Sequence, residues 1–183
     1  FTANGGSISG ATVGCFDVNA GSGNITYTGN ITCPVGRIVD ITARTGGTIA
    51  LSGNLSATGS GSGINVASNS GGTVNFSGTS KSLGTTTGAA VTLATNTGAT
   101  INFTGGGLAI TTTSGSGFNA TGGATAITVQ GAGNTIASTT GTPLNVANSA
   151  IGASGLTFQS IAANGAASGI SLNTTGSSGG LTV

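Results

Sequence analysis

The side chains in this sequence that could act in catalysis, ligand binding or disulfide formation are two carboxylates, three cations and two thiols. They are Asp17, Asp40, Arg37, Arg44, Lys81, Cys15 and Cys33. The sequence has no histidine, and its formal net charge is +1. General acid–base catalysis needs groups that titrate near neutral pH, and metal sites need clustered ligands, so we expect no catalytic residue, metal or cofactor. A net charge of +1 also provides no basic surface for nucleic acid.

Asp17 and Asp40 lie at equivalent positions in two similar segments, each between two apolar residues. Two carboxylates at equivalent positions suggest a paired acid site, or a cation site of the kind found in pectin-cleaving β-helices. Those enzymes need further acids and a basic residue facing a groove. The equivalent positions farther along the chain are uncharged, namely Asn65, Thr92, Asn119, Asn145 and Ser171. We therefore interpret the set as an outward polar row whose two acids are neutralised by Arg37 and Arg44.

Lys81 is isolated in the sequence, and we interpret it as a solvated turn residue. Cys15 and Cys33 are 18 residues apart and are the only cysteines. An even cysteine count in a chain with extracellular character favours a disulfide, which would stabilise the N-terminal coil by about 3 kcal/mol. The alternative is a pair of small buried thiols.

A repeat indicates which elements position these residues. Short units with the pattern apolar-x-apolar recur between turns of Gly, Asn, Ser and Thr, and they form three series. The first series is Phe16/Val18, Val39/Ile41, Ile64/Val66, Val91/Leu93, Phe118/Ala120, Leu144/Val146 and Ile170/Leu172. The second is Ile25/Tyr27, Ile49/Leu51, Val74/Phe76, Ile101/Phe103, Ile127/Val129, Leu156/Phe158 and Leu181/Val183. The third is Ile31, Leu55, Leu83, Ile110, Ile136 and Ile161.

All three series share one drifting period of 23–29 residues. This period predicts an all-β parallel β-helix (a solenoid) of about 6–7 coils, with three short strands per coil. We expect the helix to be right-handed, because parallel crossover connections almost always are. We expect one domain over 1–183, in which 15–183 form the coils and 1–14 form a cap or a strand-addition segment. We expect many of the 37 glycines at corners that need a positive φ. The alternative fold is an antiparallel sandwich or barrel, which would not require this repeat.

No run of 18 apolar residues is present, so the sequence predicts no transmembrane helix. The sequence opens with Phe1 rather than Met, and we interpret it as a processed mature chain or an excised fragment.

Residues 133–183 carry the strongest family resemblance. They read GNTIASTTGTPLNVANSAIGASGLTFQSIAANGAASGISLNTTGSSGGLTV. This stretch resembles the Gly/Asn/Thr-rich units of very large bacterial β-strand-repeat surface proteins, which are similar in style to autotransporter passengers and filamentous adhesins. The resemblance extends in style over 16–183 and includes no catalytic motif. It implies a secreted or surface-exposed bacterial protein with a structural or adhesive role.

Two functions of different classes follow. The first is a non-enzymatic extracellular rod that stacks end to end, with itself as a head-to-tail homopolymer or with adjoining repeats of a larger chain. The residues expected at the joint are Phe1, Ile8, Val13, Ile170, Leu172, Leu181 and Val183. The alternative is a ligand-binding module for a surface glycan or ice, using outward Thr and Asn columns. Its candidates include the triplets 85–87, 111–113 and 138–140, which recur in three successive coils and which we expect at a corner.

Overall fold

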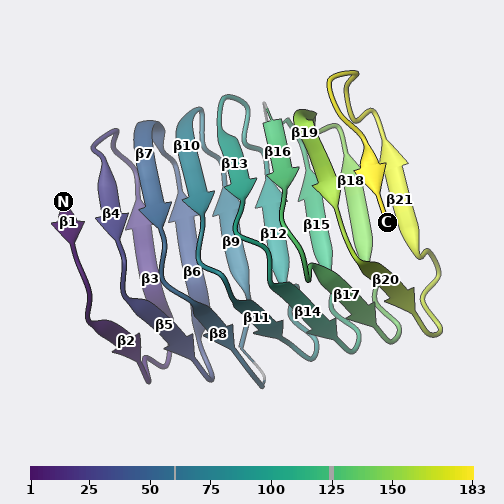
Figure 1. Cartoon of the computed structure of the whole chain (residues 1–183), viewed down its shortest axis with the longest axis horizontal. Helices are drawn as coiled ribbons and strands as arrows, with labels where there is room; N and C mark the ends of the chain where they lie inside the picture. Colours follow the sequence, from purple (N-terminus) through teal and green to yellow (C-terminus); the bar gives the residue numbers. More distant parts are fainter. Residues whose placement is uncertain (60, 124–125) are drawn as a thin grey trace.

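The computed structural model describes residues 1–59, 61–123 and 126–183, and every regular element in them is a β-strand. The strands form three sheets, here called A, B and C, in which all paired strands are parallel. In Figure 1 the strands in front run downward and those behind run upward while the coils advance away from the N-terminus. The chain is therefore a right-handed parallel β-helix of about seven coils with three strands per coil, as the repeat predicts.

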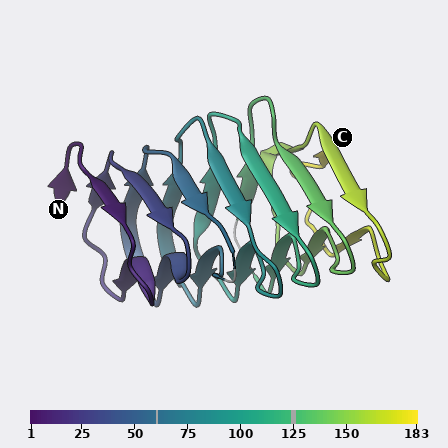
Figure 2. The ribbon, with the colours of Figure 1, turned by 90° about the horizontal axis from the view of Figure 1, so that it is seen from below.

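Each coil contributes one strand to each sheet. Sheet A contains β1 (Thr2–Ala3), β4 (Ile25–Tyr27), β7 (Thr45–Leu51), β10 (Gly71–Phe76), β13 (Thr100–Phe103), β16 (Ala126–Val129), β19 (Ile151–Thr157) and β22 (Leu181–Thr182). Sheet B contains β2 (Ser7–Ser9), β5 (Asn30–Cys33), β8 (Leu55–Ala57), β11 (Lys81–Gly84), β14 (Leu108–Thr112), β17 (Thr135–Ser138) and β20 (Ser160–Ala163). Sheet C contains β3 (Gly14–Asn19), β6 (Arg37–Thr42), β9 (Ile64–Ala67), β12 (Val91–Ala94), β15 (Phe118–Thr121), β18 (Leu144–Ala147) and β21 (Ile170–Asn173). Figure 2 shows strands of neighbouring coils side by side and in the same direction.

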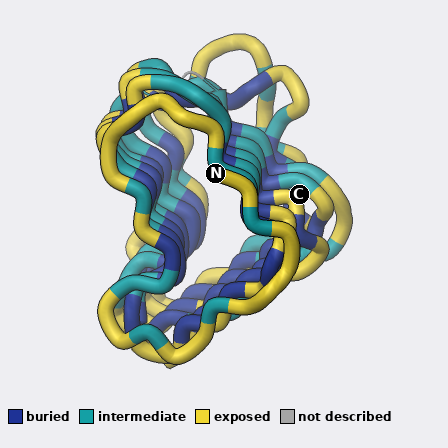
Figure 3. The backbone as a smooth tube through the Cα atoms, turned by 90° about the vertical axis from the view of Figure 1, so that its left-hand side faces the viewer, coloured by how far each residue is buried: buried dark blue, intermediate teal, exposed yellow. Residues whose placement is uncertain are grey.

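The core is one continuous cluster of apolar side chains from all three sheets that runs along the axis. Successive strand residues alternate between the inside and the outside, so Ile, Val, Leu and Phe point inward while Asn, Thr and Ser point outward. Viewed along the axis, buried residues line the inside of the coils, and the N-terminal coil in front is mostly exposed (Figure 3). Residues 1–14 supply β1 and β2, which pair with β4 and β5 as the first strands of sheets A and B.

The register confirms the first series of apolar pairs in every coil, from Phe16 to Ile170. The second series holds except at one step, where Val129 rather than Ile127 pairs with Leu156 and a bulge brings Ile151 opposite Ile127. Val129 therefore lies 27 residues before its partner Leu156, and the 29-residue step to Phe158 in the second series passes that partner by two residues.

The third series is wrong at one step. Leu55 pairs with Lys81, and Leu83 pairs with Ala57. Sheet B therefore has two inward columns. One contains Ile8, Ile31, Leu55, Lys81 and Leu108, and the other contains Cys33, Ala57, Leu83, Ile110, Ile136 and Ile161.

The corner between sheets C and A departs from the expected use of glycine. In every coil the residue that follows the sheet C strand has a positive φ, and only Gly122 among these residues is a glycine. The others are Ala20, Ala43, Ser68, Thr95, Asn148 and Thr174. The left-handed conformation costs an L-residue about 1–2 kcal/mol, so the repeated turn geometry outweighs residue preference at this corner.

No helix of the described residues has the length and apolar character needed to cross a membrane.

Candidate functional site

A polar ladder runs along the outside of sheet C. Its members pair in register from coil to coil, and they are Asp17, Asp40, Asn65, Thr92, Asn119, Asn145 and Ser171. This row, here called the sheet C ladder, is the one that the sequence predicts.

Hydrogen bonds join two pairs of neighbouring side chains in the sheet C ladder. The Asn65 amide donates to Asp40 Oδ1 at 2.7 Å, and the Asn145 amide donates to Asn119 Oδ1 at 2.8 Å. Sheet A has a similar outward row, in which Asn102 donates to Asn75 and Thr128 donates to Asn102. These contacts join neighbouring coils, and so the outward amides stabilise the stack of strands.

The two acids of the sheet C ladder have different surroundings. Asp40 is held by Arg37, with 3.6 Å between Arg37 Nε and Asp40 Oδ2, whereas Asp17 is exposed. In the residues that the structure describes, no pocket is found beside them and no three His, Cys, Asp or Glu side chains gather.

Arg44 does not neutralise the acids, contrary to the sequence interpretation. It is only 5% exposed and lies at the corner between sheets C and A. Its guanidinium donates to the carbonyl oxygens of Ala20 (2.8 Å), Gly23 (2.5 Å) and Gly46 (3.1 Å). Arg44 is therefore a buried cation that joins two coils through backbone carbonyls.

Lys81 is not a solvated turn residue. It begins strand β11, is 1% exposed, and occupies the inward column between Leu55 and Leu108. Its Nζ donates to the carbonyl oxygens of Gly78 (2.5 Å) and, one coil on, of Thr104 (2.9 Å) and Gly106 (2.7 Å). Burial lowers the pKa of Lys81 from 10.5 to about 8, because removal of water disfavours the charged amine.

This pKa predicts an unusual pH dependence of stability. Between pH 8 and 10.5 the unfolded chain keeps a proton on Lys81 that the folded chain has released, so the free energy of unfolding rises as pH rises through this window. Urea unfolding at pH 7.5 and pH 10 measures the effect. The Lys81→Leu variant is the control, because leucine occupies the same column in neighbouring coils. If wild type and variant gain or lose the same stability between the two pH values, the prediction is wrong.

Two buried asparagines form an internal ladder that the sequence interpretation missed. Asn69 and Asn96 follow the positive-φ residues Ser68 and Thr95 and occupy the position equivalent to Arg44. Asn69 Oδ1 accepts from the Arg44 backbone N–H at 2.7 Å, and Asn96 Oδ1 accepts from the Asn69 amide at 2.8 Å. The signal in the sequence was their spacing of 25 and 27 residues from Arg44 onward, which matches the period of the strands.

The hydroxyl triplets do not form an outward array. Thr85, Thr112 and Ser138 point inward and are nearly buried, while the residues on either side of Thr112 are exposed. Thr111 pairs with Gly84 and Ala137, so the triplets are offset by one residue rather than aligned. The buried hydroxyls bond within the turn: Thr85 donates to Gly88 O and Ser138 donates to Gly141 O, both at 2.6 Å.

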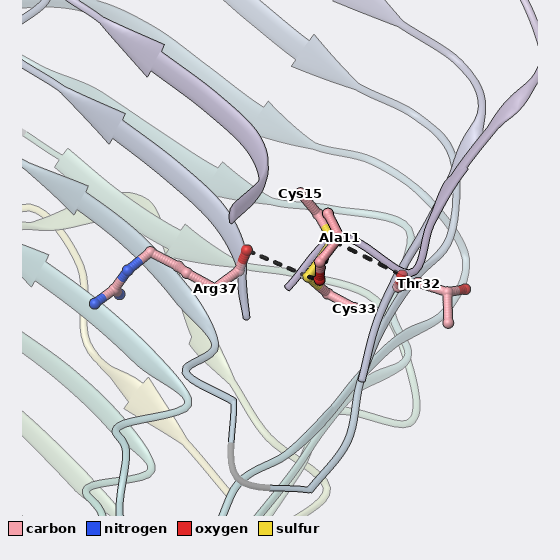
Figure 4. Close-up of a disulfide and its surroundings, with 5 residues drawn as sticks. All are labelled: Ala11, Cys15, Thr32, Cys33 and Arg37. Carbon is pink, nitrogen blue, oxygen red and sulfur yellow. Dashed lines mark hydrogen bonds between the residues drawn. A yellow bond between two sulfur atoms is a disulfide. The ribbon is translucent and has the colours of Figure 1, made fainter. Parts of the chain in front are cut away.

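The disulfide links two coils at the N-terminal end. Cys15 in β3 and Cys33 in β5 are bonded, with their Cα atoms 6.1 Å apart, so the bridge runs from sheet C of the first coil to sheet B of the second. Figure 4 shows the bridge between Ala11, Thr32 and Arg37, whose carbonyl oxygens lie 3.4–4.0 Å from the sulfurs. Because neither sulfur of a disulfide carries a hydrogen, these are close approaches and not hydrogen bonds.

The residues expected at an end-to-end joint lie on the outermost strands or in the turns beside them. Five of them are exposed, and these are Phe1, Val13, Ile170, Leu172 and Val183. Ile8 and Leu181 are partly buried against the core.

No family model, curated protein or solved structure matches this chain.

Proposed function

We propose that this protein is a non-enzymatic structural or adhesive rod of an extracellular surface fibre, in which β-helix coils continue end to end. The observation that carries the proposal is the parallel pairing of neighbouring coils in all three sheets, which continues to the outermost strands. In the described residues the outer edges of β1, β2 and β3 and of β20, β21 and β22 have no partner strand. Such edges are templates for pairing with another coil.

The surface chemistry supports an extracellular, assembling role. After Lys81 the sequence contains no charged residue, and Arg44 and Lys81 are buried, so few side-chain charges reach solvent. Little electrostatic repulsion therefore opposes contact between two copies. A disulfide at one end agrees with an oxidising compartment.

The strand count limits the form of a joint between two copies of this chain. Among the described residues, sheet A has eight strands, whereas sheets B and C have seven. In a continuous joint every copy must add the same number of strands to each sheet. As a result, β1 of one copy and β22 of its neighbour would occupy the same position in sheet A. One of these two strands must therefore leave sheet A when the joint forms. Each is only two residues long, so few backbone hydrogen bonds are lost.

Leu172→Asp tests the proposal. Leu172 lies on β21, at the outer edge of sheet C, and is 44% exposed. A carboxylate there would be buried without a partner in the joint, so we expect the variant to remain monomeric at concentrations where wild type forms polymers, as measured by sedimentation velocity. Val35→Asp is the matched control, because Val35 is 53% exposed but lies in the turn between β5 and β6. Equal polymer in Leu172→Asp and Val35→Asp would contradict this joint.

Ligand binding through outward Thr and Asn columns has less support. The amides of Asn65, Asn102 and Asn145 already donate along their own columns, and one hydroxyl residue of each triplet is buried.

A further inference from the structure

Three backbone carbonyl oxygens converge on one buried point at the corner between sheets A and B. They belong to Gly78 in one coil and to Thr104 and Gly106 in the next, and they lie 2.5–2.9 Å from Lys81 Nζ. Among the described residues no backbone N–H in a turn or loop donates to any of the three. The chain thus holds a cluster of acceptors that needs a donor or a cation.

No carboxylate balances the charge of Lys81. The two carboxylates of the sequence, Asp17 and Asp40, lie on strands β3 and β6 of sheet C, two or more coils away. The ammonium group is therefore held by carbonyl dipoles alone, which is how backbone oxygens hold monovalent cations in selectivity filters.

Two of the three carbonyl positions recur two coils farther on, where a different side chain fills the space between them. Asn134 lies in the column of Lys81 and Leu108, and its amide donates to Gly131 O at 2.9 Å and Thr157 O at 3.0 Å. These oxygens are three residues before and 23 residues after Asn134, the same offsets that Gly78 and Thr104 have from Lys81. The convergence therefore belongs to the backbone of the corner and is not produced by the lysine.

A second cation is held in the same way at another corner. Arg44 donates to three carbonyl oxygens from two coils, as described above. Both long cationic side chains that are buried in this fold thus end in groups of carbonyl oxygens.

We propose that the point enclosed by Gly78, Thr104 and Gly106 is a binding site for a monovalent cation, which this chain fills with the ammonium group of Lys81. The site is independent of the proposed rod function. Oxygen distances of 2.5–2.9 Å fit ammonium and potassium. A site with no carboxylate lacks the charged oxygen ligands that calcium and magnesium take.

Removing the lysine side chain tests the proposal. In Lys81→Ala the carbonyl oxygens stay, and the space left by the side chain admits an ion with water as further ligand. We expect the melting temperature of Lys81→Ala to be several degrees higher in 0.5 M ammonium or potassium chloride than in tetramethylammonium chloride of the same ionic strength, because an ion that binds only the folded state stabilises it. Tetramethylammonium is too large for the site and donates no hydrogen bond.

Wild type and Lys81→Leu serve as matched controls. In wild type the site is already filled, and in Lys81→Leu an apolar side chain occupies the column, as Leu55 and Leu108 do. We expect the melting temperature of each control to be the same in the three salts, apart from the general effect of each salt on protein stability. Identical melting of Lys81→Ala in all three salts overturns the proposal, as does an equal difference in Lys81→Leu. If Lys81→Ala does not fold in tetramethylammonium chloride, refolding in ammonium chloride supports the site, and failure in every salt overturns it.

Discussion

Replacing Phe103 with alanine is expected to lower the free energy of unfolding by about 3–5 kcal/mol. Phe103 is fully buried in sheet A, stacks on Phe76 with ring centroids 4.7 Å apart, and meets Phe118 edge to face at 5.6 Å. Its loss removes apolar burial and two aromatic contacts, and it leaves a cavity between rigid parallel strands. Urea unfolding followed by circular dichroism measures the change.

Phe1→Ala is the control for this variant. Phe1 is 79% exposed, so the same chemical change there should alter stability by less than 0.5 kcal/mol or so. If Phe103→Ala and Phe1→Ala unfold at the same urea concentration, Phe103 does not lie in the interior of a solenoid. Because each coil contacts only its neighbours, we also expect amide exchange to accelerate most in β10, β13 and β16.

Removing the disulfide is expected to cost about 3 kcal/mol, concentrated in the first two coils. Cys15→Ala/Cys33→Ala is the suitable variant, because Cys33 lies in the same inward column as Ala57 and alanine fits there. Without the bridge, β1, β2 and β3 are held by strand pairing and a small part of the core, so they should exchange their amide hydrogens faster. Hydrogen exchange read by mass spectrometry measures this loss.

Wild type in a thiol reductant distinguishes the bond from the side chains. Reduction breaks the bond and keeps both cysteine side chains. If the bond itself stabilises the first coil, the amide hydrogens of reduced wild type should exchange as fast there as those of the double variant. Unchanged protection of β2 and β3 in both samples would show that the disulfide does not hold the first coil. Equal destabilisation of β18 and β21 would show that the effect is not local.

The sequence predicts the β-helix because two periods coincide in it. The two-residue period assigns residues such as Ile64 and Val66 to the inside, and the coil period stacks them on Val91 and Leu93. The sheet C ladder follows from the same arithmetic, since Asp17 and Asp40 are flanked by members of the first series.

The register errors have one physical cause. In sheet B the third series slips from Leu55 to Leu83, and in sheet A the second slips from Ile127 to Leu156. Each slip is two residues, which leaves inward residues inward, so the hydrophobic pattern is the same before and after it. Coil-to-coil pairing alone distinguishes the two registers.

The slip in sheet B also hid the position of Lys81. In the sequence Lys81 precedes an apolar residue by two, but its charge suggested solvent rather than the core. Its burial depends on carbonyl oxygens of Thr104 and Gly106, more than 20 residues away, which no local pattern encodes. The hydroxyl triplets were misplaced for a related reason, because three consecutive hydroxyl residues such as 111–113 do not show which one points inward.

Electron microscopy of the purified chain over a range of concentrations tests the central proposal, the continuation of coils from one copy to the next, most directly. In a continuous joint each copy adds seven coils, so with a strand spacing of about 4.8 Å we expect thin, unbranched fibres with an axial repeat of about 34 Å. Discrete rods of one short length at every concentration would contradict end-to-end stacking.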